Sequence, residues 1–380
     1  MKQKMKLIYI SHARLPTEKA HGYQIAKMCE SFGFQGVETE LWLPHRRAYQ
    51  TEDAYQAYGL ENTFWIKKIW IIDLLRKGAP FQKILYRIQT SIFLLHIVCS
   101  RFPHDAVVYT RSADIAFVCS LRSRKVIYED HGWPKKTGLY LLLLKRVHYI
   151  VAITKGIADL YHKQDSTLKK ILVAPDAVEL DVFKDAPQRE KVRAEFGISS
   201  SAKIILYTGS FYLYSWKGVD VVLEAAQYLP AECAVVLIGG TSAEVKSLRK
   251  QYQSRSIHIV ERKSQTHIPM YLKAADVLVL PNKKGDIASE RYTSPLKLFE
   301  YMAAKVPIVA SKLPSIEEIL NTSNACLVEP NDSRALAEGI IRLLQQPEHS
   351  QLLAEKAYQD VQHNTWKKRA HTILDFISHD

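Results

Sequence analysis

The sequence contains few cysteines and lacks the patterns that several classes of protein require. Its five cysteines form no C-x-x-C pair and have no regular spacing, which indicates buried thiols in a reducing compartment rather than a disulfide framework. No set of residues has the spacing of metal ligands, so we expect no bound metal. The cysteines that we expect to be buried are Cys29, Cys99, Cys119, Cys233 and Cys326.

Long apolar runs are also absent from the sequence. The longest, residues 91–99, is much shorter than the roughly 20 residues of a membrane-spanning helix. The chain starts with basic residues, but a short strand pattern and then polar residues follow them, so we expect no signal peptide. These observations predict a cytoplasmic protein.

The net charge of +13 is unevenly distributed along the 380 residues. Residues 1–180 contain 27 lysines and arginines against 16 acidic residues, a balance of +11, whereas residues 181–380 contain 25 against 23, a balance of +2. A basic first half favours an anionic partner, such as a membrane surface, a nucleic acid, or a phosphorylated lipid or sugar. The alternative is a basic surface that only keeps the protein in solution.

Short apolar runs alternate with helical patterns in both halves of the chain, on either side of a stretch, residues 176–190, that is typical of a linker. No G-x-G-x-x-G follows the first strand, so the dinucleotide-binding fingerprint is absent. The alternation predicts an α/β protein with two Rossmann-like domains facing a cleft. We expect the domains to span residues 1–180 and 181–362, followed by a last helix in residues 363–380. The expected strands are residues 6–10, 37–43, 106–110, 125–131, 149–153, 171–175, 203–209, 233–239, 257–260, 277–281, 308–310 and 326–328.

One stretch of the first half mixes an apolar face with four cations. Residues 64–77 contain Lys67, Lys68, Arg76 and Lys77 among tryptophans and aliphatic residues. Such a segment can lie in a membrane interface. A packed helix with solvated lysines is the other interpretation.

Residues 292–310 predict a loop, a helix and a buried strand. Ser294 can cap the helix, and Pro295 suits the first helical position. The N–H groups of Leu296 and Lys297 then lie in the first turn, where an anion can bind them, and the side chain of Lys297 adds a positive charge. Glu300 lies one turn further on the same face and can accept two hydrogen bonds from a diol such as a ribose. Together these features predict a nucleoside diphosphate site; the alternative is a surface ion pair between Lys297 and Glu300.

Polar residues also end two expected strands of the first half. The strand 106–110 ends at Arg111, and the strand 125–131 ends in a polar cluster that includes His131. Parallel sheets bind ligands at the carboxyl ends of their strands. We therefore interpret His131 as a site residue rather than a core histidine.

Four stretches resemble the large retaining family 4 of GT-B glycosyltransferases, also called glycosyl transferases group 1, and the resemblance extends over nearly the whole chain. They are residues 294–303 with 307–311, residues 207–210 with 217–220, residues 14–22, and residues 128–131. The helix that starts at Trp366 is similar to the family's C-terminal helix, which crosses back to the N-terminal domain. The resemblance implies the GT-B fold.

The resemblance also implies roles for individual residues. Glu300 would bind the donor ribose, and Lys217 the donor diphosphate with help from the start of the helix. His131 would lie beside the transferred sugar, and Gly22 would let the backbone approach the reacting groups. The nucleobase would lie near Arg262. The implied donor-binding residues are Gly22, Gly209, Ser210, Lys217, Arg262, Lys263, Thr293, Ser294, Pro295, Leu296, Lys297 and Glu300, and the implied catalytic residues are His131, Lys217 and Glu290.

Three positions depart from the family's pattern. Tyr292 stands where a first glutamate is usual, and Glu290 is a possible substitute. Ser210 replaces an arginine that binds phosphate, so that Lys297 or Arg291 would supply the missing charge. Lys305 stands where the helix usually ends in glycine, a position whose left-handed backbone strains any other residue.

The resemblance implies transfer of a sugar, with retention and without metal or cofactor, from a nucleoside diphosphate sugar to a glycan or lipid-linked acceptor. Such an enzyme would act in cell-envelope polysaccharide or glycoconjugate synthesis, in the cytoplasm or at the inner face of the cytoplasmic membrane, where it would contact anionic lipid. An epimerase on the same fold is one alternative. A basic module that binds membrane or nucleic acid is another, although charge alone suggests it and we expect no nucleic-acid partner.

Overall fold

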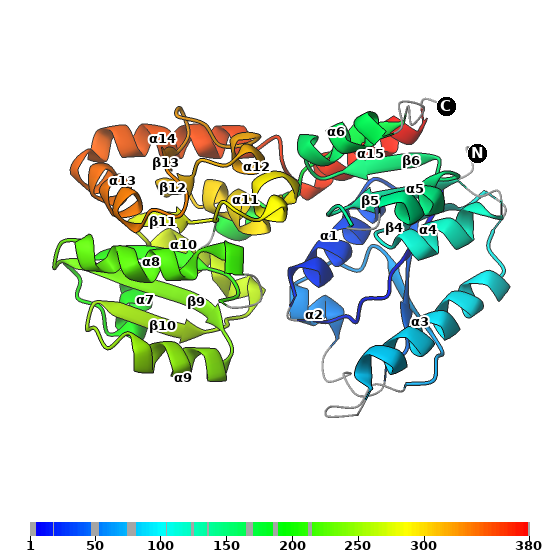
Figure 1. Cartoon of the computed structure of the whole chain (residues 1–380), viewed down its shortest axis with the longest axis horizontal. Coiled ribbons are helices and arrows are strands. Elements are labelled where there is room, and N and C mark those ends of the chain that lie inside the picture. Colours follow the sequence, from blue (N-terminus) through cyan, green and yellow to red (C-terminus); the bar gives the residue numbers. More distant parts are fainter. Residues whose placement is uncertain are drawn as a thin grey trace. The chain divides into compact units, whose positions relative to one another are not determined.

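The computed structural model describes residues 5–17, 19–46, 53–73, 81–103, 105–122, 125–134, 137–164, 170–184, 189–211 and 215–378. The chain divides into two compact units (Figure 1). Unit 1 comprises Met1–Ile153, Ile157–Pro175 and Trp366–Asp380, and unit 2 comprises Thr154–Gly156 and Asp176–Thr365. The last helix of the chain therefore belongs to the N-terminal unit.

Unit 1 is built on a seven-stranded sheet in which all neighbouring strands are parallel. Its first strand is buried on both faces, because Leu7, Ile8, Tyr9 and Ile10 are all 0% exposed, as is usual for a parallel sheet covered by helices. In spatial order the strands are β3 (Trp65–Ile69), β2 (Glu38–Pro44), β1 (Lys6–Ile10), β4 (Val107–Thr110), β5 (Val126–Asp130), β6 (Tyr149–Ala152) and β7 (Ile171–Val173).

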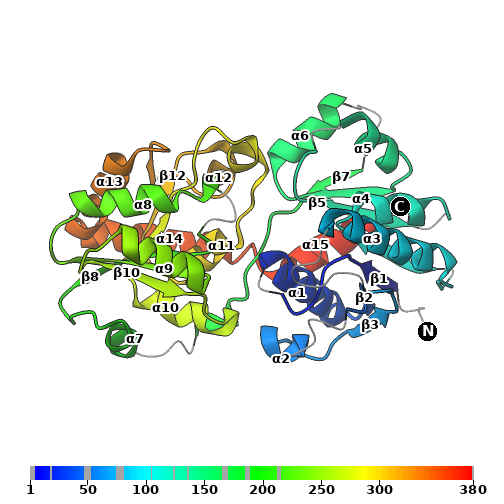
Figure 2. The same cartoon turned by 60° about the horizontal axis from the view of Figure 1, so that its bottom comes forward.

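The helices of unit 1 form two packed groups. One joins α1 with α2 and α15, and Figure 2 shows α15 lying along α1. Trp366, at the start of α15, is 1% exposed and packs edge-on against Tyr23. The other group joins α3, α4 and α5. The helices are α1 (Ala20–Phe34), α2 (Ala54–Tyr58), α3 (Gln82–Cys99), α4 (Ala113–Ser120), α5 (Thr137–Leu144), α6 (Lys155–Gln164) and α15 (Trp366–Ser378).

The helical interpretation of residues 64–77 is wrong for the part that the structure describes. Residues 65–69 form β3, the edge strand next to β2, and residues 74–77 lie outside the described ranges. Trp65 and Trp70 are exposed, and Lys67 Nζ lies 4.0 Å from the ring centroid of Trp42. An edge strand can leave cations and aromatic rings on its solvent side, so the same residues suit either structure. Cys99, which we expected to be buried, is exposed at the end of α3.

Unit 2 is built on a six-stranded parallel sheet with a separate apolar core on each face. Alternate residues of β8 enter different cores: Ile204 and Leu206 pack on one face, and Ile205 and Tyr207 on the other. In spatial order the strands are β10 (Ile257–Glu261), β9 (Cys233–Gly240), β8 (Lys203–Thr208), β11 (Val277–Leu280), β12 (Ile308–Ser311) and β13 (Cys326–Val328).

The helices of unit 2 cover both faces of this sheet. Residues 176–190, expected to be a linker, include the one-turn helix η2, whose Phe183 is buried in a core. The α-helices are α7 (Arg189–Phe196), α8 (Val219–Ala225), α9 (Ser242–Gln251), α10 (Ile268–Ala274), α11 (Leu296–Ala303), α12 (Pro314–Glu317), α13 (Ser333–Gln345) and α14 (Pro347–Val361). The 3-10 helices are η2 (Asp181–Phe183), η3 (Ser215–Lys217), η4 (Ala226–Tyr228) and η5 (Gln265–His267), and η6 (Ala288–Tyr292) is a π-helix.

Candidate functional site

The strand order of each sheet reverses direction at one point, between β1 and β4 in unit 1 and between β8 and β11 in unit 2. Open α/β sheets bind ligands at such a point, beyond the carboxyl ends of the strands. In unit 2, Gly209 and Ser210 follow β8, and Pro281 and Asn282 follow β11. The sequence motif that resembles a phosphate loop is therefore at the position where the topology predicts a ligand.

The loop after β8 depends on closely packed glycines. Gly209 has φ +133°, and a Cβ added to Gly239 would lie 2.3 Å from the carbonyl oxygen of Gly209. Gly218 has φ +69°, and a Cβ there would lie 1.8 Å from the carbonyl oxygen of Pro281. These approaches bring the turn that carries Lys217 against the loop after β11, and no larger residue fits either position.

Lys217 points into the loop after β8, as predicted. It ends η3, and its Nζ donates a hydrogen bond of 2.6 Å to Oγ of Ser210. Burial lowers the pKa of Lys217 to about 8, because a low-dielectric environment disfavours the charged ammonium. Ser210, which stands where the family usually has a phosphate-binding arginine, thus contacts Lys217.

Lys297 is a second cation in the same region, and its Nζ is buried although the residue as a whole is only partly buried. Its Nζ lies 3.9 Å from the ring centroid of Tyr207 and, among the described residues, has no hydrogen-bond partner. Burial, and secondly the charge of Lys217, hold the pKa of Lys297 well below its ordinary value. An anion beside the two lysines would offset both effects. The two lysines are therefore candidates for binding an anion.

The start of α11 differs from the prediction in its cap. The N-cap is Pro295, with φ −76° and ψ 125°, and no side chain caps the helix. The Oγ of Ser294 instead accepts a hydrogen bond of 2.9 Å from the backbone N–H of Asp176. Leu296 and Lys297 still lie in the first turn, where the N–H groups have no partner within the helix.

Glu300 is partly buried in unit 2, and it does not form the surface ion pair with Lys297 that was the alternative interpretation. Among the described residues no ion pair joins it to Lys297; its Oε1 accepts a hydrogen bond from Nε2 of Gln265. Burial raises the pKa of Glu300 to about 7. Gln265, at the start of η5, is a site residue that the sequence analysis missed, because a single glutamine in a loop carries no motif.

The residues expected near the nucleobase have other contacts. Lys263 Nζ forms an ion pair of 2.7 Å with Glu195, and the side chain of Arg262 is exposed. Gln265, only a few residues further, is the member of this loop that reaches Glu300. A role of Arg262 and Lys263 in binding a base stays a prediction.

The residues before α11 form the π-helix η6 and a short connection. Glu290 accepts a hydrogen bond of 2.7 Å from the N–H of Gly285, Tyr292 is buried, and Arg291 is exposed. Thr293 follows η6 in extended backbone. The structure does not bring Glu290 or Arg291 into contact with Lys217 or Lys297, and their roles stay predictions.

Asn282 is a second residue that the sequence analysis missed. Its side chain is 0% exposed, and neither amide atom has a hydrogen-bond partner among the described residues. Both chain neighbours of Asn282 contact the turn that carries Lys217. The carbonyl oxygen of Pro281 packs on Gly218, and the backbone N–H of Lys283 donates a hydrogen bond to the carbonyl oxygen of Trp216. A buried amide without partners costs about 1–3 kcal/mol, and this one lies beside the turn of Lys217.

Unit 1 contains a buried polar cluster at the end of β5. Glu129 is 0% exposed and accepts hydrogen bonds from Gln24 Nε2 at 2.6 Å and from Arg369 at 3.1 Å. Tyr109 and His131 also donate to its carboxylate, through the hydroxyl group and Nε2 respectively. His131 thus lies at the carboxyl end of a central strand, as the sequence predicts, and it is held by a carboxylate two residues before it.

The charges around His131 favour its neutral form. Burial and the neighbouring guanidinium of Arg111 lower its pKa to about 3, against the opposing effect of Glu129. Arg111 also donates to the side-chain oxygen of Gln24 at 2.8 Å. The pKa of Glu129 is well below its ordinary range, because Arg369 and His131 outweigh its burial. A neutral imidazole next to an ionised carboxylate is the state at neutral pH.

Gly22 lies in the first turn of α1, and the structure gives a reason for glycine there. A Cβ at this position would be 2.3 Å from Cγ2 of Thr17 and 2.7 Å from the hydroxyl of Tyr58. Tyr58 in turn exchanges hydrogen bonds with the backbone of Thr17. Gly22 therefore lets the loop after β1 pack on the helix, and contact with reacting groups stays a prediction.

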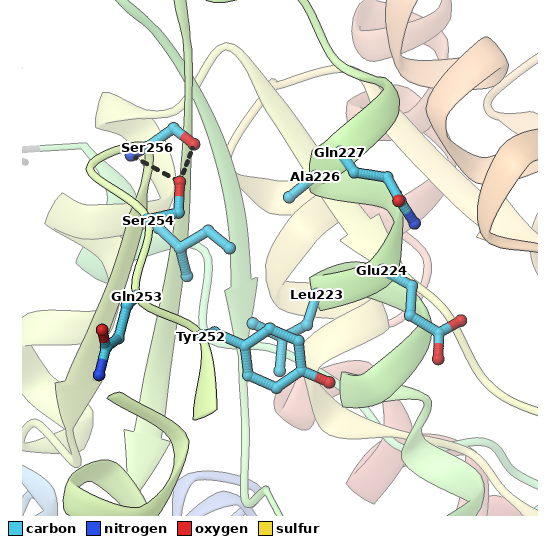
Figure 3. A pocket seen from close by; sticks show the side chains of 9 residues that line it. Leu223, Glu224, Ala226, Gln227, Tyr252, Gln253, Ser254 and Ser256 are labelled. Carbon is cyan, nitrogen blue, oxygen red and sulfur yellow. Dashed lines mark hydrogen bonds between the residues drawn. The ribbon is translucent and has the colours of Figure 1, made fainter. Parts of the chain in front are cut away.

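A cavity of about 340 Å³ lies elsewhere in unit 2 (Figure 3). Its lining includes Leu223 of α8, Tyr252 after α9 and Ile257 at the start of β10. These residues lie at the amino end of a strand, whereas ligands of open parallel sheets bind at the carboxyl ends. None of the residues that the sequence analysis proposed lines it.

Comparison with known proteins agrees with the resemblance of the motifs. Residues 202–346 match the family model of the glycosyl transferases group 1. The D-inositol 3-phosphate glycosyltransferase of Xylanimonas cellulosilytica is 28% identical over 240 residues, which are 60% of this chain and 55% of that protein. An uncharacterized glycosyltransferase of Methanocaldococcus jannaschii is 23% identical over 307 residues, 75% of this chain and 74% of that protein. The chain thus spans between about half and three quarters of these curated relatives.

The fold is similar to that of solved structures over nearly the whole chain. HepE from Anabaena, in complex with UDP, matches with a TM-score of 0.75 at 16% identity, over 99% of this chain and 100% of that chain. Two parallel sheets with interleaved helices and a last helix that returns to the first unit define a protein with the GT-B fold. The family match lies within unit 2, where residues 202–346 are similar to the glycosyl transferases group 1. In the part that the structure describes, no helix is both long and apolar enough to span a bilayer.

Proposed function

We propose that the protein transfers a hexosyl group, with retention and without metal, from a nucleoside diphosphate sugar to a glycan or lipid-linked acceptor. One observation carries this proposal: two partly buried lysines, Lys217 and Lys297, meet a glycine loop at the switch point of a parallel sheet, and the carboxylate of Glu300 lies one helical turn from Lys297. Unit 2 supplies the donor site. The basic unit 1, with His131, binds the acceptor and the transferred sugar.

The buried cations act on the departing diphosphate. When the bond between the sugar carbon and the diphosphate oxygen breaks, negative charge builds on that oxygen, and the acceptor hydroxyl forms the new bond and loses its proton. Lys217, Lys297 and the first turn of α11 are fixed before this charge develops. Preorganised donors of this kind stabilise a transition state more than a ground state.

UDP is the first nucleotide to test. The structural neighbour HepE was solved in complexes with UDP and with UDP-glucose, although its 16% identity supports only the fold. We expect UDP to raise the unfolding temperature more than GDP, ADP or CDP at equal concentration. A ligand at 100 times its dissociation constant stabilises a protein by about 2.7 kcal/mol.

The test of transfer is release of free nucleotide that depends on an acceptor. Nucleotide release from the donor sugar only when acceptor is present supports transfer, whereas interconversion of sugars without acceptor indicates an epimerase. The control is Lys217→Ala, which keeps the fold and removes the proposed cation. If neither UDP nor any other nucleoside diphosphate stabilises the protein or binds by calorimetry, the proposed function is wrong.

The acceptor side is proposed to work at an anionic membrane surface in the cytoplasm. The +11 balance of the first half motivates this, and α3 strengthens it. Ile84, Ile88, Leu95 and Val98 are all exposed. At 3.6 residues per turn they form one stripe, opposite the buried face of the helix. An exposed apolar stripe on a basic unit suits the interface of an anionic bilayer.

Sedimentation with vesicles tests the membrane proposal. We expect binding to phosphatidylserine-containing vesicles that weakens with salt, weak binding to neutral vesicles, and a loss in Ile88→Ser. Val182→Ser is the matched control, because Val182 is an exposed aliphatic residue of unit 2. Equal, salt-insensitive binding to both kinds of vesicle, or equal loss in both variants, would contradict the proposal.

A further inference from the structure

The cluster around Glu129 fixes a hydrogen atom on His131. An ionised carboxylate can only accept hydrogen bonds, and Glu129 contacts Nε2 of the imidazole. Nε2 must therefore carry the hydrogen. In the neutral imidazole, which the pKa of about 3 makes the state at neutral pH, Nδ1 then has a free lone pair. His131 presents an acceptor, not a donor, at that atom.

Each carboxylate oxygen of Glu129 has two donors. Gln24 and His131 donate to Oε1, and Tyr109 and Arg369 donate to Oε2. The side chain of Gln24 is itself held by Arg111, which donates to its oxygen. The four donors restrict rotation of the carboxylate, and the carboxylate in turn fixes the position of Nε2 of the imidazole.

Arg369 is the countercharge that keeps this carboxylate ionised in the interior. It comes from α15, far along the chain from β5, and its side chain is 3% exposed. Its Nε donates to the carbonyl oxygen of Pro175 at 2.7 Å, and a terminal nitrogen donates to that of Ala174 at 3.0 Å. These bonds anchor the guanidinium to the end of β7 while its other nitrogen reaches Glu129. The geometry depends on the docking of α15.

We infer that Glu129 and Arg369 are positioning residues, which together hold His131 as the Nε2–H tautomer with Nδ1 free to accept a hydrogen bond. The consequence for catalysis rests on the proposed function, because it requires His131 to act beside the transferred sugar. A hydroxyl group of that sugar, or of the acceptor, then donates to Nδ1. The C-terminal helix thereby contributes to the chemistry as well as to packing.

The tautomer can be measured without any substrate. In protein labelled with 15N-histidine, long-range proton–nitrogen correlation spectra distinguish the two tautomers, and the His131→Asn variant identifies the signal among the 14 histidines. We expect the Nε2–H tautomer at pH 7. An Nδ1–H tautomer, or a doubly protonated ring, would overturn the inference.

Glu129→Gln tests the coupling to Arg369. Because a guanidinium can only donate, the new amide turns its oxygen toward the charged Arg369 and its NH2 group toward His131, and the weaker hydrogen bond from neutral Gln24 is lost. Nε2 must then accept, and the tautomer changes to Nδ1–H. In the double variant Glu129→Gln/Arg369→Met this constraint is gone, the amide oxygen can face the imidazole again, and Nε2–H returns. An unchanged tautomer in Glu129→Gln would contradict the role of Arg369.

The double variant also separates positioning from stability. It contains no buried unpaired charge, so it stays folded even if Arg369→Met alone does not. Arg193→Met is the matched control: Arg193 is a buried arginine of unit 2 that binds two backbone carbonyl groups and Asp276 in the same manner. We expect Arg193→Met to lower stability and leave the His131 spectrum unchanged. A change of the His131 spectrum in Arg193→Met would show a general effect of unfolding.

Activity supplies the second readout. We expect Glu129→Gln to lower the turnover of sugar transfer by about 10²-fold, the effect of a misplaced catalytic group, with UDP affinity unchanged. Normal turnover combined with a changed tautomer would show that His131 needs no fixed acceptor and would refute the catalytic part. Absence of any transfer in the wild type, together with the expected tautomer, would refute the proposed function and leave the positioning intact.

Discussion

Two polar clusters, one in each unit, treat buried charge in opposite ways. In unit 1, the carboxylate of Glu129 has four hydrogen-bond donors, and one of them is the guanidinium of Arg369. In unit 2, Lys297 Nζ is buried against a tyrosine ring and has no hydrogen-bond partner among the described residues. Asn282 is buried in the same way. The polar groups of the first cluster find all their hydrogen-bond partners within the chain, whereas Lys297 and Asn282 find none among the described residues.

This difference indicates which unit changes more on binding a ligand. A satisfied buried network rigidifies the fold around it, whereas unsatisfied buried groups lower stability until a partner arrives. We expect unit 2 to regain this free energy when it binds the proposed anion with a diol. The polar cluster of unit 1, in contrast, holds its shape with or without a ligand.

A pair of matched substitutions tests the comparison most strongly. Arg369→Met leaves Glu129 buried and without its cation, and we expect it to lower the free energy of unfolding by about 3–5 kcal/mol. Lys297→Met removes a buried cation that has no anion, and we expect a gain of about 1 kcal/mol in the free protein. Urea unfolding of both variants measures these changes. A loss of equal size in both would mean that the two clusters do not differ.

Lys217→Ala is expected to lower turnover by about 10²–10³-fold, the effect of removing one preorganised donor, while the fold survives. Lys217→Arg is expected to recover only part of the rate, because a forked guanidinium replaces a compact ammonium. Steady-state kinetics on folded variants provide the measurement. Near-normal turnover in Lys217→Ala would move the role to Lys297 or Arg291.

Glu300→Gln is expected to weaken nucleotide binding by roughly 1.5–3 kcal/mol for each charge-assisted hydrogen bond lost, as measured by calorimetry. The pKa of Glu300 is raised to about 7, so the wild-type affinity should increase as the pH rises through 7. It should decrease again above pH 8, where Lys217, with a pKa of about 8, loses its charge. In Glu300→Gln, the affinity should no longer rise around pH 7, but it should still fall above pH 8. Unchanged affinity would argue against ribose binding.

The same raised pKa affects the stability of the free protein. Because the folded pKa lies above the ordinary value of 4.5, ionised Glu300 destabilises the fold increasingly from pH 4.5 to about 7 and constantly above that. Glu300→Gln should remove this part of the pH dependence. The prediction needs no nucleotide, and it therefore tests the burial of the carboxylate separately from its function.

Lys305→Gly is expected to have the smallest effect. Lys305 has φ +55° and follows Ala304, the C-cap of α11, and its Nζ lies 3.1 Å from Oε1 of Glu355. The change to glycine relieves about 1–2 kcal/mol of strain in the left-handed backbone. It also removes the exposed ion pair with Glu355, which lowers this gain by up to about 1 kcal/mol. Thermal unfolding should show a gain of a few degrees, and UDP affinity should not change. A change in affinity would mean that the end of α11 affects the anion site.

The sequence predicted the site best where local pattern determines geometry. A glycine before a helix places Lys217 in the loop after β8, and the spacing of three positions places Lys297 and Glu300 on one face of α11. The positive φ of Lys305 also follows from its position after the helix. Short parallel strands were predicted because their residues are buried on both sides.

Contacts between distant segments could not be predicted in this way. Arg369 and Glu129 are 240 positions apart, and Asp176 and Ser294 are 118 apart. Ser294 has the ideal chemistry of a cap, but a backbone N–H from another loop takes its hydroxyl group. Residues 65–69 were interpreted as part of a helix or an interfacial segment, although tryptophan and lysine also suit the edge strand that they form. Gln265 and Asn282 carry no motif, and only tertiary packing brings them to the site.

The return of α15 to unit 1 has a consequence for how the protein is made. During synthesis, residues 1–175 leave the ribosome long before Trp366 and Arg369 do. Until then, the nascent first unit lacks the helix that packs on α1 and the guanidinium of Arg369 that binds Glu129, so it cannot reach its full stability. A chain that stops before residue 366 therefore remains incomplete in its earliest part, where proteases can remove it before it acts.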